Sequence, residues 1–267
     1  MPRLILCADD FAFSTDTSHV IAELAADRRL TATSCMAVLP NWTGDARLLD
    51  TAPDTLEVGL HLVLTLEAPV TAAPTLAPAG ILPTIDHLRR AAARGTLPLA
   101  EMAAEIAAQF DRFESARGRA PAFVDGHQHA HALKGVREIV LDEIARRAPA
   151  AWVRTCTDAL PALLARPFRG KALASAVHSV GLRRAAAARG IACNAGFAGH
   201  YDFARDYDTI FPAFLRRPGE RHLVMCHPGT GARAGDAIAA ARVREAAALR
   251  RLPIAAIARA HGLVFPG

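Results

Sequence analysis

The sequence predicts an α/β fold in which parallel strands form a TIM-barrel-like (β/α) barrel, of irregular shape, with helices on its outer face. Short apolar runs alternate along the chain with longer segments rich in Ala, Arg, Glu and Leu. This alternation is typical of strands that are buried on both faces between helices. The chain has 267 residues, of which 52% are hydrophobic, and this length suits one barrel domain of about eight strand–helix units. A doubly wound open sheet is the alternative.

Eight apolar runs are the candidate strands, because each is short and is bounded by polar or turn-forming residues. In chain order they are Leu4–Ala8, Thr31–Val38, Leu56–Leu62, Ala122–Gly126, Ala151–Arg154, Ile191–Asn194, His222–Cys226 and Leu263–Phe265.

Several of the intervening segments carry helix signals. A Ser/Thr capping signal precedes Thr15–Arg28. Within Leu99–Arg117, three apolar side chains are spaced four residues apart and therefore share one face. Similar patterns predict helices over Gly135–Arg147, Lys171–Arg189 and Arg242–Arg251. The stretch 67–98 is instead rich in Pro and Ala, and since it follows a candidate site strand we expect a flap over the active face.

The composition argues against several classes of protein. The net charge is +5, but the arginines are scattered, so we expect no nucleic-acid partner. No glycine-rich nucleotide-binding loop is present. Five widely spaced cysteines without a CxxC pair fit a reducing cytoplasm. Acidic residues come too early for a signal peptide, and no apolar stretch approaches the roughly 20 residues of a membrane helix. A cytoplasmic homodimer is the resulting expectation.

Residues with chemically useful side chains follow several candidate strands. In parallel α/β folds the carboxyl ends of the strands form the ligand-binding face. Each residue alone has an ordinary explanation, such as a turn aspartate or a hydrogen-bonded core histidine, but their coincidence on one face indicates a site. They are Asp9 and Asp10 just past the first strand, His61 at the end of the third, Asp125, His127, His129 and His131 after the fourth, and His227 after the seventh.

A divalent metal ion would explain both the adjacent carboxylates and the clustered histidines. Alternate residues of an extended HxHxH segment point to one face, and neutral imidazole is a common metal ligand. One aspartate would bind the ion while the other stays free to accept a proton. One carboxylate and two histidines leave coordination positions open, as in a catalytic site.

At these residues the sequence resembles the YdjC/ChbG family of carbohydrate deacetylases. The matching motifs occur in order from the first strand almost to the C-terminus: "ADDF" at 8–11, "TATS" at 31–34, "VGLHLVLT" at 58–65, "DGHQHAH" at 125–131, "WVR" at 152–154 and "HPG" at 227–229. The resemblance implies one barrel-like domain over 1–267 and a site for one divalent ion, Mg or Zn. It also implies removal of an N-acetyl group from amino sugars, including chitin-derived disaccharides.

The resemblance also assigns roles by position. Asp10, His61 and His127 match the metal ligands, Asp9 matches the general base, and His227 matches a candidate general acid.

Further residues are candidates for the substrate side of the site, namely Phe11, His129, His131 and Arg154. The histidines could also support the ligands, and Arg154 either holds Asp9 ionised or has a structural role.

The sequence departs from the family pattern at two places. Ala12 stands where the family usually has glycine, so a positive φ at this turn would carry strain. The segment after "HPG" lacks an expected acidic stretch, which leaves His227 without an evident carboxylate partner.

Two other functions are compatible with the same residues. Two histidines and one carboxylate also form the iron(II) triad of oxygenases, but that triad usually lies on an all-β jelly roll. A degenerate relative that only binds metal or sugar is the second alternative, and Asp9 argues against it, because metal retention alone needs no second carboxylate.

Overall fold

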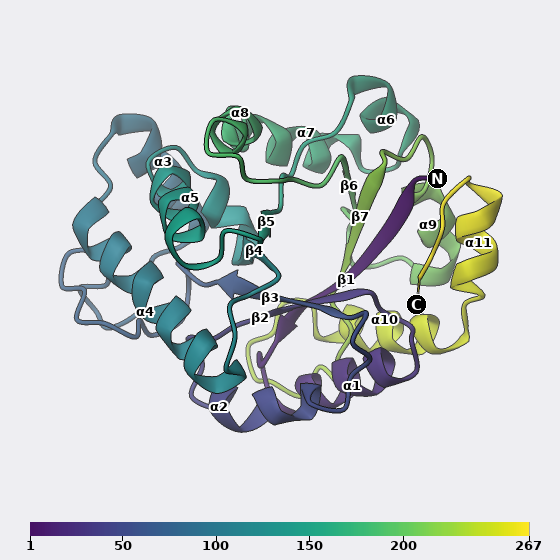
Figure 1. Cartoon of the computed structure of the whole chain (residues 1–267), viewed down its shortest axis with the longest axis horizontal. Coiled ribbons are helices and arrows are strands. Elements are labelled where there is room, and N and C mark those ends of the chain that lie inside the picture. Colours follow the sequence, from purple (N-terminus) through teal and green to yellow (C-terminus); the bar gives the residue numbers. More distant parts are fainter. Residues whose placement is uncertain (267) are drawn as a thin grey trace.

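The computed structural model describes residues 1–266, which form one parallel sheet surrounded by helices (Figure 1). The strand order is β5-β4-β3-β2-β1-β7-β6, and every neighbouring pair is parallel. The strands are β1 (Arg3–Phe11), β2 (Ala32–Cys35), β3 (Glu57–Leu62), β4 (Phe123–Gly126), β5 (Trp152–Val153), β6 (Gly196–Ala198) and β7 (Arg221–Cys226).

Helices connect the strands and cover the outer face of the sheet. In Figure 1, α1 and α10 lie below β1, while α3, α4 and α5 lie to the left of β3 and β4. The α-helices are α1 (Thr15–Ala26), α2 (Trp42–Asp45), α3 (Ile85–Arg94), α4 (Leu99–Arg117), α5 (Val136–Arg147), α6 (Leu160–Ala165), α7 (Arg169–His178), α8 (Leu182–Ala187), α9 (Tyr207–Phe214), α10 (Ala239–Arg251) and α11 (Ile254–Ala260); two 3₁₀ helices are η1 (Ala46–Leu49) and η2 (His127–Ala132).

The sheet closes into an irregular barrel at residues 192–198. On one side, Val153 of β5 forms a parallel bridge with Cys193 and donates a hydrogen bond to the Ala192 carbonyl at 2.9 Å. On the other side, Ala195 donates to the Arg221 carbonyl at 3.0 Å, and β6 continues the pairing with β7. The predicted barrel-like α/β fold is therefore confirmed, with a single bridge at its seam.

Two predicted strands are wrong in place or kind. The strand expected at 191–194 contributes only the bridge at Cys193, and the paired strand β6 begins at Gly196. The run expected at 263–265 is not a strand of the sheet, since it contributes one bridge between Val264 and Arg3. Both runs are too short for their apolar composition to fix where pairing starts.

One helix expectation also needs correction. The segment Lys171–Arg189 is divided into α7 and α8, because Gly181 has a φ of 89°, which a right-handed helix cannot contain. The expected flap at 67–98 contains α3, whose N-cap Thr84 accepts a hydrogen bond from the His87 amide. The helix α4 has the predicted bounds.

The barrel interior is filled by a small apolar cluster that includes Ile5 and Cys7 of β1. Phe123 and Trp152 stack there with their ring centroids 4.5 Å apart. A Cβ at Gly59 would lie 2.5 Å from the Phe123 ring, so only glycine leaves room for it. Because residues alternate in direction along β1, the next inward side chain after Cys7 belongs to Asp9, where the interior becomes polar.

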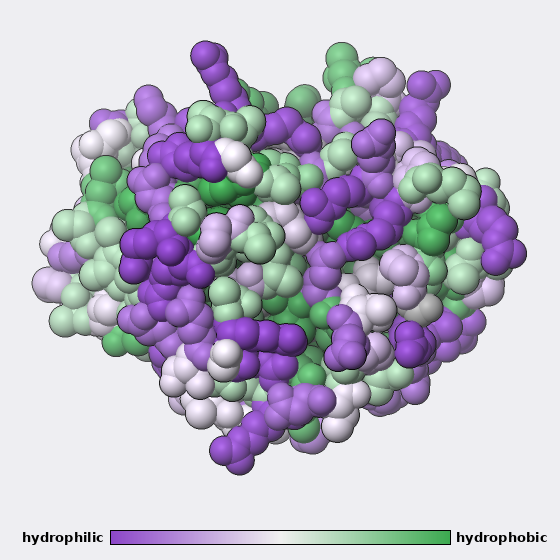
Figure 2. Space-filling view, viewed as in Figure 1, coloured by the Kyte–Doolittle hydropathy of each residue, from purple (hydrophilic) through white to green (hydrophobic). Residues whose placement is uncertain are grey.

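The molecular surface mixes polar and apolar residues. On the face shown in Figure 2, hydrophilic residues are interspersed with smaller hydrophobic groups. Among the helices of residues 1–266, none combines the length and the apolar character needed to cross a bilayer.

Candidate metal centre and active site

Asp9 and Asp10 of the "ADDF" motif lie at the end of β1, inside the strand rather than just past it. Neighbouring residues of a regular strand point to opposite faces. Here the register with β2 shifts between Ala8 and Phe11, and Asp10 has a φ of 66°. This bulge directs two adjacent carboxylates into one polar cluster. Ala12 has a φ of 71°, so the expected positive φ at the position of the family glycine is present.

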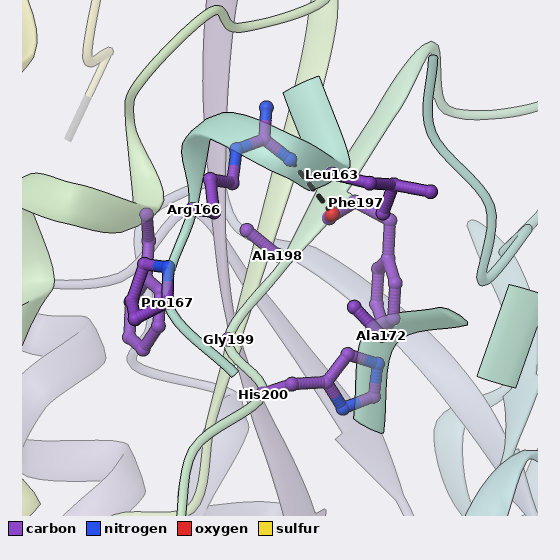
Figure 3. Close-up of a pocket in the computed structure, with 9 residues that line it drawn as sticks. Leu163, Arg166, Pro167, Ala172, Phe197, Ala198, Gly199 and His200 are labelled. Carbon is purple, nitrogen blue, oxygen red and sulfur yellow. Dashed lines mark hydrogen bonds between the residues drawn. The ribbon is translucent and has the colours of Figure 1, made fainter. Parts of the chain in front are cut away.

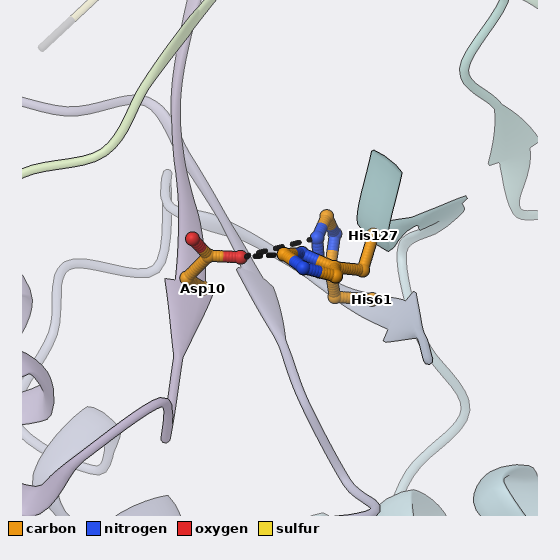
Figure 4. A group of neighbouring side chains, drawn as sticks. All are labelled: Asp10, His61 and His127. Atoms are coloured by element: carbon orange, nitrogen blue, oxygen red, sulfur yellow. Dashed lines mark hydrogen bonds and ion pairs between the residues drawn. The ribbon is translucent and has the colours of Figure 1, made fainter. Parts of the chain in front are cut away.

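Three potential metal ligands meet at the carboxyl ends of β1, β3 and β4 (Figure 4). Asp10 Oδ1 lies 3.4 Å from His61 Nε2 and 3.2 Å from His127 Nδ1. Asp10 and His61 are buried, whereas His127 is partly exposed. The cluster is therefore reachable from solvent only on the His127 side.

Asp125 and Ser34 hold the opposite edge of the His61 ring. Asp125 Oδ1 lies 2.6 Å from His61 Nδ1, and the Ser34 hydroxyl donates to the same carboxylate oxygen. Burial alone favours neutral imidazole, but Asp125 and Asp10 outweigh it and raise the pKa of His61 to about 10. The ring directs Nδ1 to Asp125 and Nε2 to Asp10, and a carboxylate on the far nitrogen is the usual support of a metal-binding histidine.

The donor set fits a divalent ion. Neighbouring atoms bound to one ion at about 2.0–2.1 Å lie roughly 2.8–3.4 Å apart, with the shorter spacing in octahedral and the longer in tetrahedral geometry. The contacts of Asp10 Oδ1 with the two imidazole nitrogens have this spacing. One carboxylate oxygen and two imidazole nitrogens suit Zn²⁺ and other borderline divalent ions, and they leave positions for water or substrate.

Asp9 is held by the Arg154 guanidinium. Arg154 donates to Asp9 Oδ2 at 2.6 Å and to Oδ1 at 2.5 Å, and it also lies 2.6 Å from Asp125 Oδ2. All three side chains are almost fully buried. Cys7, Asp9 and Asp125 form a second cluster of possible ligand atoms, but the guanidinium occupies it. The predicted contact of Arg154 with Asp9 is present.

A second arginine holds the other aspartate. Arg242 of α10 donates to Asp10 Oδ2 at 2.7 Å, and its Nε donates to Asp236 at 2.7 Å. Burial opposes ionisation of Asp10, but Arg242 and the hydrogen bond from His127 outweigh it and hold the pKa of Asp10 well below its usual range. Asp9 and Asp10 are therefore each paired with a different arginine, Arg154 and Arg242 respectively.

The histidine-rich segment is not extended, so the alternation argument for it is wrong. Residues 127–132 form η2, in which Gln128 and His129 have φ values of 53° and 61°. His131 turns into the core, where its Nε2 lies 2.9 Å from the Arg154 carbonyl oxygen and its exposure is 0%. It supports the segment that carries Arg154 and has no surface for substrate.

His129 lies on the β6 side of the cluster. Its ring packs edge-to-face on Phe197 and His200, with centroid distances of 5.5 and 5.6 Å. Burial lowers the pKa of His129 well below its usual value and that of His200 to about 4. Both rings are therefore neutral at pH 7, and His200 lines the pocket described next.

A pocket lies between the end of β6 and the segment from α6 to α7 (Figure 3). The Arg166 guanidinium at its edge donates to the Phe197 carbonyl at 3.0 Å, and His200 lies at the opposite side in this view. The lining residues are Leu163, Arg166, Pro167, Ala172, Phe197, Ala198, Gly199, His200 and Phe214.

His227 directly follows β7. The pairing of Ala8 with Cys226 places it beside Asp9 in the sheet register. Its backbone N–H donates to Glu245, while its Nδ1 is buried without a hydrogen-bond partner. Glu245 comes from α10 and is fully buried, which raises its pKa above the usual value. This glutamate supplies the carboxylate near His227 that the sequence after "HPG" lacks.

Phe11 does not fit its predicted contact with substrate. Its side chain has 0% exposure and packs edge-to-face on Trp42 at 6.4 Å, within the core between the sheet and the helices.

Known proteins share this sequence pattern over most of the chain. The family model described as "YdjC-like protein" matches residues 3–259. The chain belongs to the YdjC-like family.

Two proteins of similar sequence are named chitooligosaccharide deacetylases. A protein of that name from Klebsiella pneumoniae (strain 342) is 33% identical over 84% of this chain and 81% of its own length. One from Enterobacter sp. (strain 638) is 35% identical over 56% of this chain and 58% of its own length. The matched part thus spans little more than half of the Enterobacter relative.

A solved structure supports the fold. A crystal structure from Enterococcus faecalis V583, provisionally named a cellobiose-phosphate cleavage protein, superimposes with a TM-score of 0.71. The alignment covers 98% of this chain and 96% of that one at 19% identity. This similarity establishes the shared fold of the YdjC-like chain.

Several side chains of the site were not found from the sequence. Ser34 lay within the quoted motif "TATS" without a role, and His200 had no motif at all. Arg242 and Glu245 belong to an alanine-rich helix, where they are 2% and 0% exposed. A charged pair three residues apart on the buried face of a helix was the available signal, because such charges are rarely buried unpaired.

Proposed function

We propose that this YdjC-like protein is a metal-dependent hydrolase that removes an N-acetyl group from an acetylated amino sugar or short chitooligosaccharide. The observation that carries the proposal is the convergence of Asp10, His61 and His127, with donor spacing suited to one divalent ion. The names of the relatives supply the substrate class.

Asp10, His61 and His127 would hold the ion, either Mg²⁺ or Zn²⁺. When bound, such an ion supplies Lewis-acid activation of a water molecule and of the acetyl carbonyl. Asp125 and Ser34 keep His61 oriented for this purpose. The protein residues around the ion then handle the protons of the reaction.

Asp9 is the proposed general base, which accepts a proton from the attacking water. Arg154 binds both of its carboxylate oxygens and thereby fixes the direction of the carboxylate. Each oxygen keeps a second lone pair for a proton. A base held in one orientation needs no rearrangement during the reaction.

His227 is the proposed general acid, which gives a proton to the departing amine of the sugar. An amine leaves poorly unless it is protonated, so this step needs a donor. The unpartnered Nδ1 of His227 and its place beside Asp9 in the register support this role. Glu245 fixes the backbone of His227 through the amide.

On the substrate side, His129 is the remaining ring candidate from the sequence, with His200 as its neighbour. The expected partner is a small acetylated saccharide. A homodimer, a cytoplasmic location and the lack of a nucleic-acid partner stay predictions. Light scattering, cell fractionation and an electrophoretic shift assay test them.

The alternatives are less well supported. The iron-oxygenase triad usually lies on a jelly roll, whereas this sheet is entirely parallel and covered by helices. A metal-binding relative without activity would not need the buried Asp9–Arg154 pair beside the ligands.

The decisive experiment is a screen of N-acetylglucosamine-containing saccharides with protein that has been stripped by a chelator and reloaded with single divalent metals. We expect acetate release, loss of one acetyl mass and an unchanged number of sugar units. Shortened saccharides that keep every acetyl group would contradict the proposal, and so would a metal-loaded protein that is inactive on the whole panel.

A further inference from the structure

Arg242 is a buried arginine in direct contact with a proposed metal ligand. Its Nη2 donates to Asp10 Oδ2 at 2.7 Å, and its side chain is only 2% exposed. The other carboxylate oxygen, Oδ1, is the one that faces both His61 and His127. The two oxygens of Asp10 therefore have separate partners.

The surroundings fix the guanidinium in this position. Its Nε donates to Asp236 Oδ2 at 2.7 Å. Its Cζ lies 4.4 Å from the centroid of the Phe13 ring, and Arg233 stacks on the same ring at 4.2 Å. Stacking on an aromatic face favours one orientation of the planar guanidinium.

The loops after β7 and β3 contact Arg242 and its neighbour Arg233. Gly229 of the "HPG" loop donates its amide hydrogen to the Arg242 carbonyl at 3.2 Å. Arg233 donates to both carboxylate oxygens of Glu67, each at 2.7 Å, and so joins the loop after β7 to the loop after β3. Arg233 thus shares the aromatic partner of Arg242 but has its own carboxylate.

We propose that Arg242 is a positioning residue that makes Asp10 a one-oxygen ligand and lowers the affinity of the site for the cation. The inference rests on the proposed metal site. Because Oδ2 is occupied by Arg242, the ion can use Oδ1 alone. A coordination position that a chelating carboxylate would fill is left for water or substrate.

Charge determines the expected direction of the effect. A guanidinium bound to the ligand carboxylate repels a dication on the other oxygen and withdraws electron density from it. A neutral side chain at this position should therefore tighten metal binding. It should slow turnover as well, since Asp10 could then chelate the ion.

The test uses Co²⁺ as the probe, with calorimetry for affinity and the visible absorption spectrum for coordination number. Arg242→Gln removes the charge and is too short to reach Asp10, although its amide can still donate to Asp236 in place of Nε. Arg242→Lys keeps the charge. We expect Arg242→Gln to bind Co²⁺ about 10- to 100-fold more tightly, which is the usual scale of effects on a ligand's neighbours. Its spectrum should be weaker, as for a higher coordination number. Arg242→Lys should stay near wild type.

Arg233→Met is the matched control, because it removes the other arginine of the Phe13 stack without touching Asp10. It should leave Co²⁺ affinity and spectrum unchanged. If Arg242→Gln fails to fold, the double variant Arg242→Met/Asp236→Asn removes the charge together with its second partner.

The outcomes separate the two proposals. A wild-type protein that binds no Co²⁺ overturns both. The wild-type protein can bind Co²⁺ while Arg242→Gln binds it no more tightly and shows an unchanged spectrum. That result overturns the role of Arg242 alone. An equal response to Arg233→Met would also overturn it, since general disturbance of the stack would then explain the effect.

Discussion

The two halves of the barrel are built differently. In the first half, β1 and β3 have nine and six residues, and their ends carry the clustered Asp10 and His61. In the second half, β5 and β6 have two and three residues, and only β7 reaches six. All three proposed metal ligands come from the first half, with Asp10 and His61 inside β1 and β3 and His127 directly after β4.

The second half contributes supports and loops instead. Arg154 follows β5 and reaches across to Asp9 and Asp125, and Arg242 of α10 holds Asp10, so several buried ion pairs connect the halves. The helices α6 and α7 leave apolar side chains more than half exposed at Leu160, Leu164, Leu173 and Val177. The comparison indicates that the proposed metal ligands are concentrated in the first half, while the second half supplies residues that support them.

The strongest test of this division replaces one histidine in each half by alanine. His61→Ala should lose bound metal and reduce activity to background, because the ion loses a ligand that Asp125 holds in place. His200→Ala, at the end of β6, should keep stoichiometric metal. Metal analysis of the two purified variants measures the contrast. Equal metal content in both would break the comparison.

The ion pair between Asp9 and Arg154 should affect the catalytic rate rather than metal binding. Asp9→Asn keeps the size of the side chain but removes its basicity, so kcat should fall by roughly 10²–10⁴ while the metal stays bound. Asp10→Asn should weaken metal binding instead. Steady-state kinetics with parallel metal analysis tests both. The reverse pattern would exchange the assigned roles of the two aspartates.

Acid should destabilise the two halves by a similar mechanism. Burial lowers the pKa of His131, in the first half, and that of His222, in β7, to about 4. Both titrate near pH 6.5 when unfolded. As the pH falls from about 6.5 towards 4, the unfolded chain takes up protons that the folded chain does not, so stability falls.

The cost is on the order of 3 kcal/mol for each histidine by pH 4. Urea unfolding of His131→Gln and His222→Gln between pH 7 and 4.5 should show a shallower loss than wild type. His19→Gln, at an exposed position, is the control and should follow wild type. A shallower slope in only one of the two variants would mean that the halves differ in their response to acid.

The smallest effect is expected at the exposed apolar positions of the second half. Leu173→Ser and Val177→Ser should change the free energy of unfolding by no more than about 0.5 kcal/mol, because these side chains already face solvent. Metal content and activity should stay unchanged. A larger loss would mean that α7 is buried in the assembled protein.

The sequence predicted the first half of the fold better than the second for a physical reason. Strands β1, β3 and β4 are apolar runs that can be recognised, as is β7 in the second half, and α4 has clear periodicity and the predicted bounds. The position of β6 depends on pairing with β7 at one end and on the bridge of Cys193 to β5 at the other. Such distant partners leave little local signal.

The same distinction applies to the site. The rule that side chains gather at strand ends placed Asp10, His61 and His127 on one face, and the family resemblance selected them as ligands. The prediction from the "HQHAH" alternation was wrong because the segment turns at Gln128, whose positive φ no residue pattern announced. The partners Ser34 and Arg242 come from distant segments, and only the folded chain brings them to His61 and Asp10.

The seam between Val153 and Cys193 has a consequence for how the molecule opens. Six residue pairs join β1 to β7, whereas one bridge joins β5 to the chain before β6. Opening the seam breaks few backbone hydrogen bonds, so its free energy should lie far below that of global unfolding. The amide of Val153 should exchange its hydrogen with solvent earlier than the amides in the middle of β1. The barrel should therefore open locally at this seam while the ligand cluster on β1, β3 and β4 is still intact.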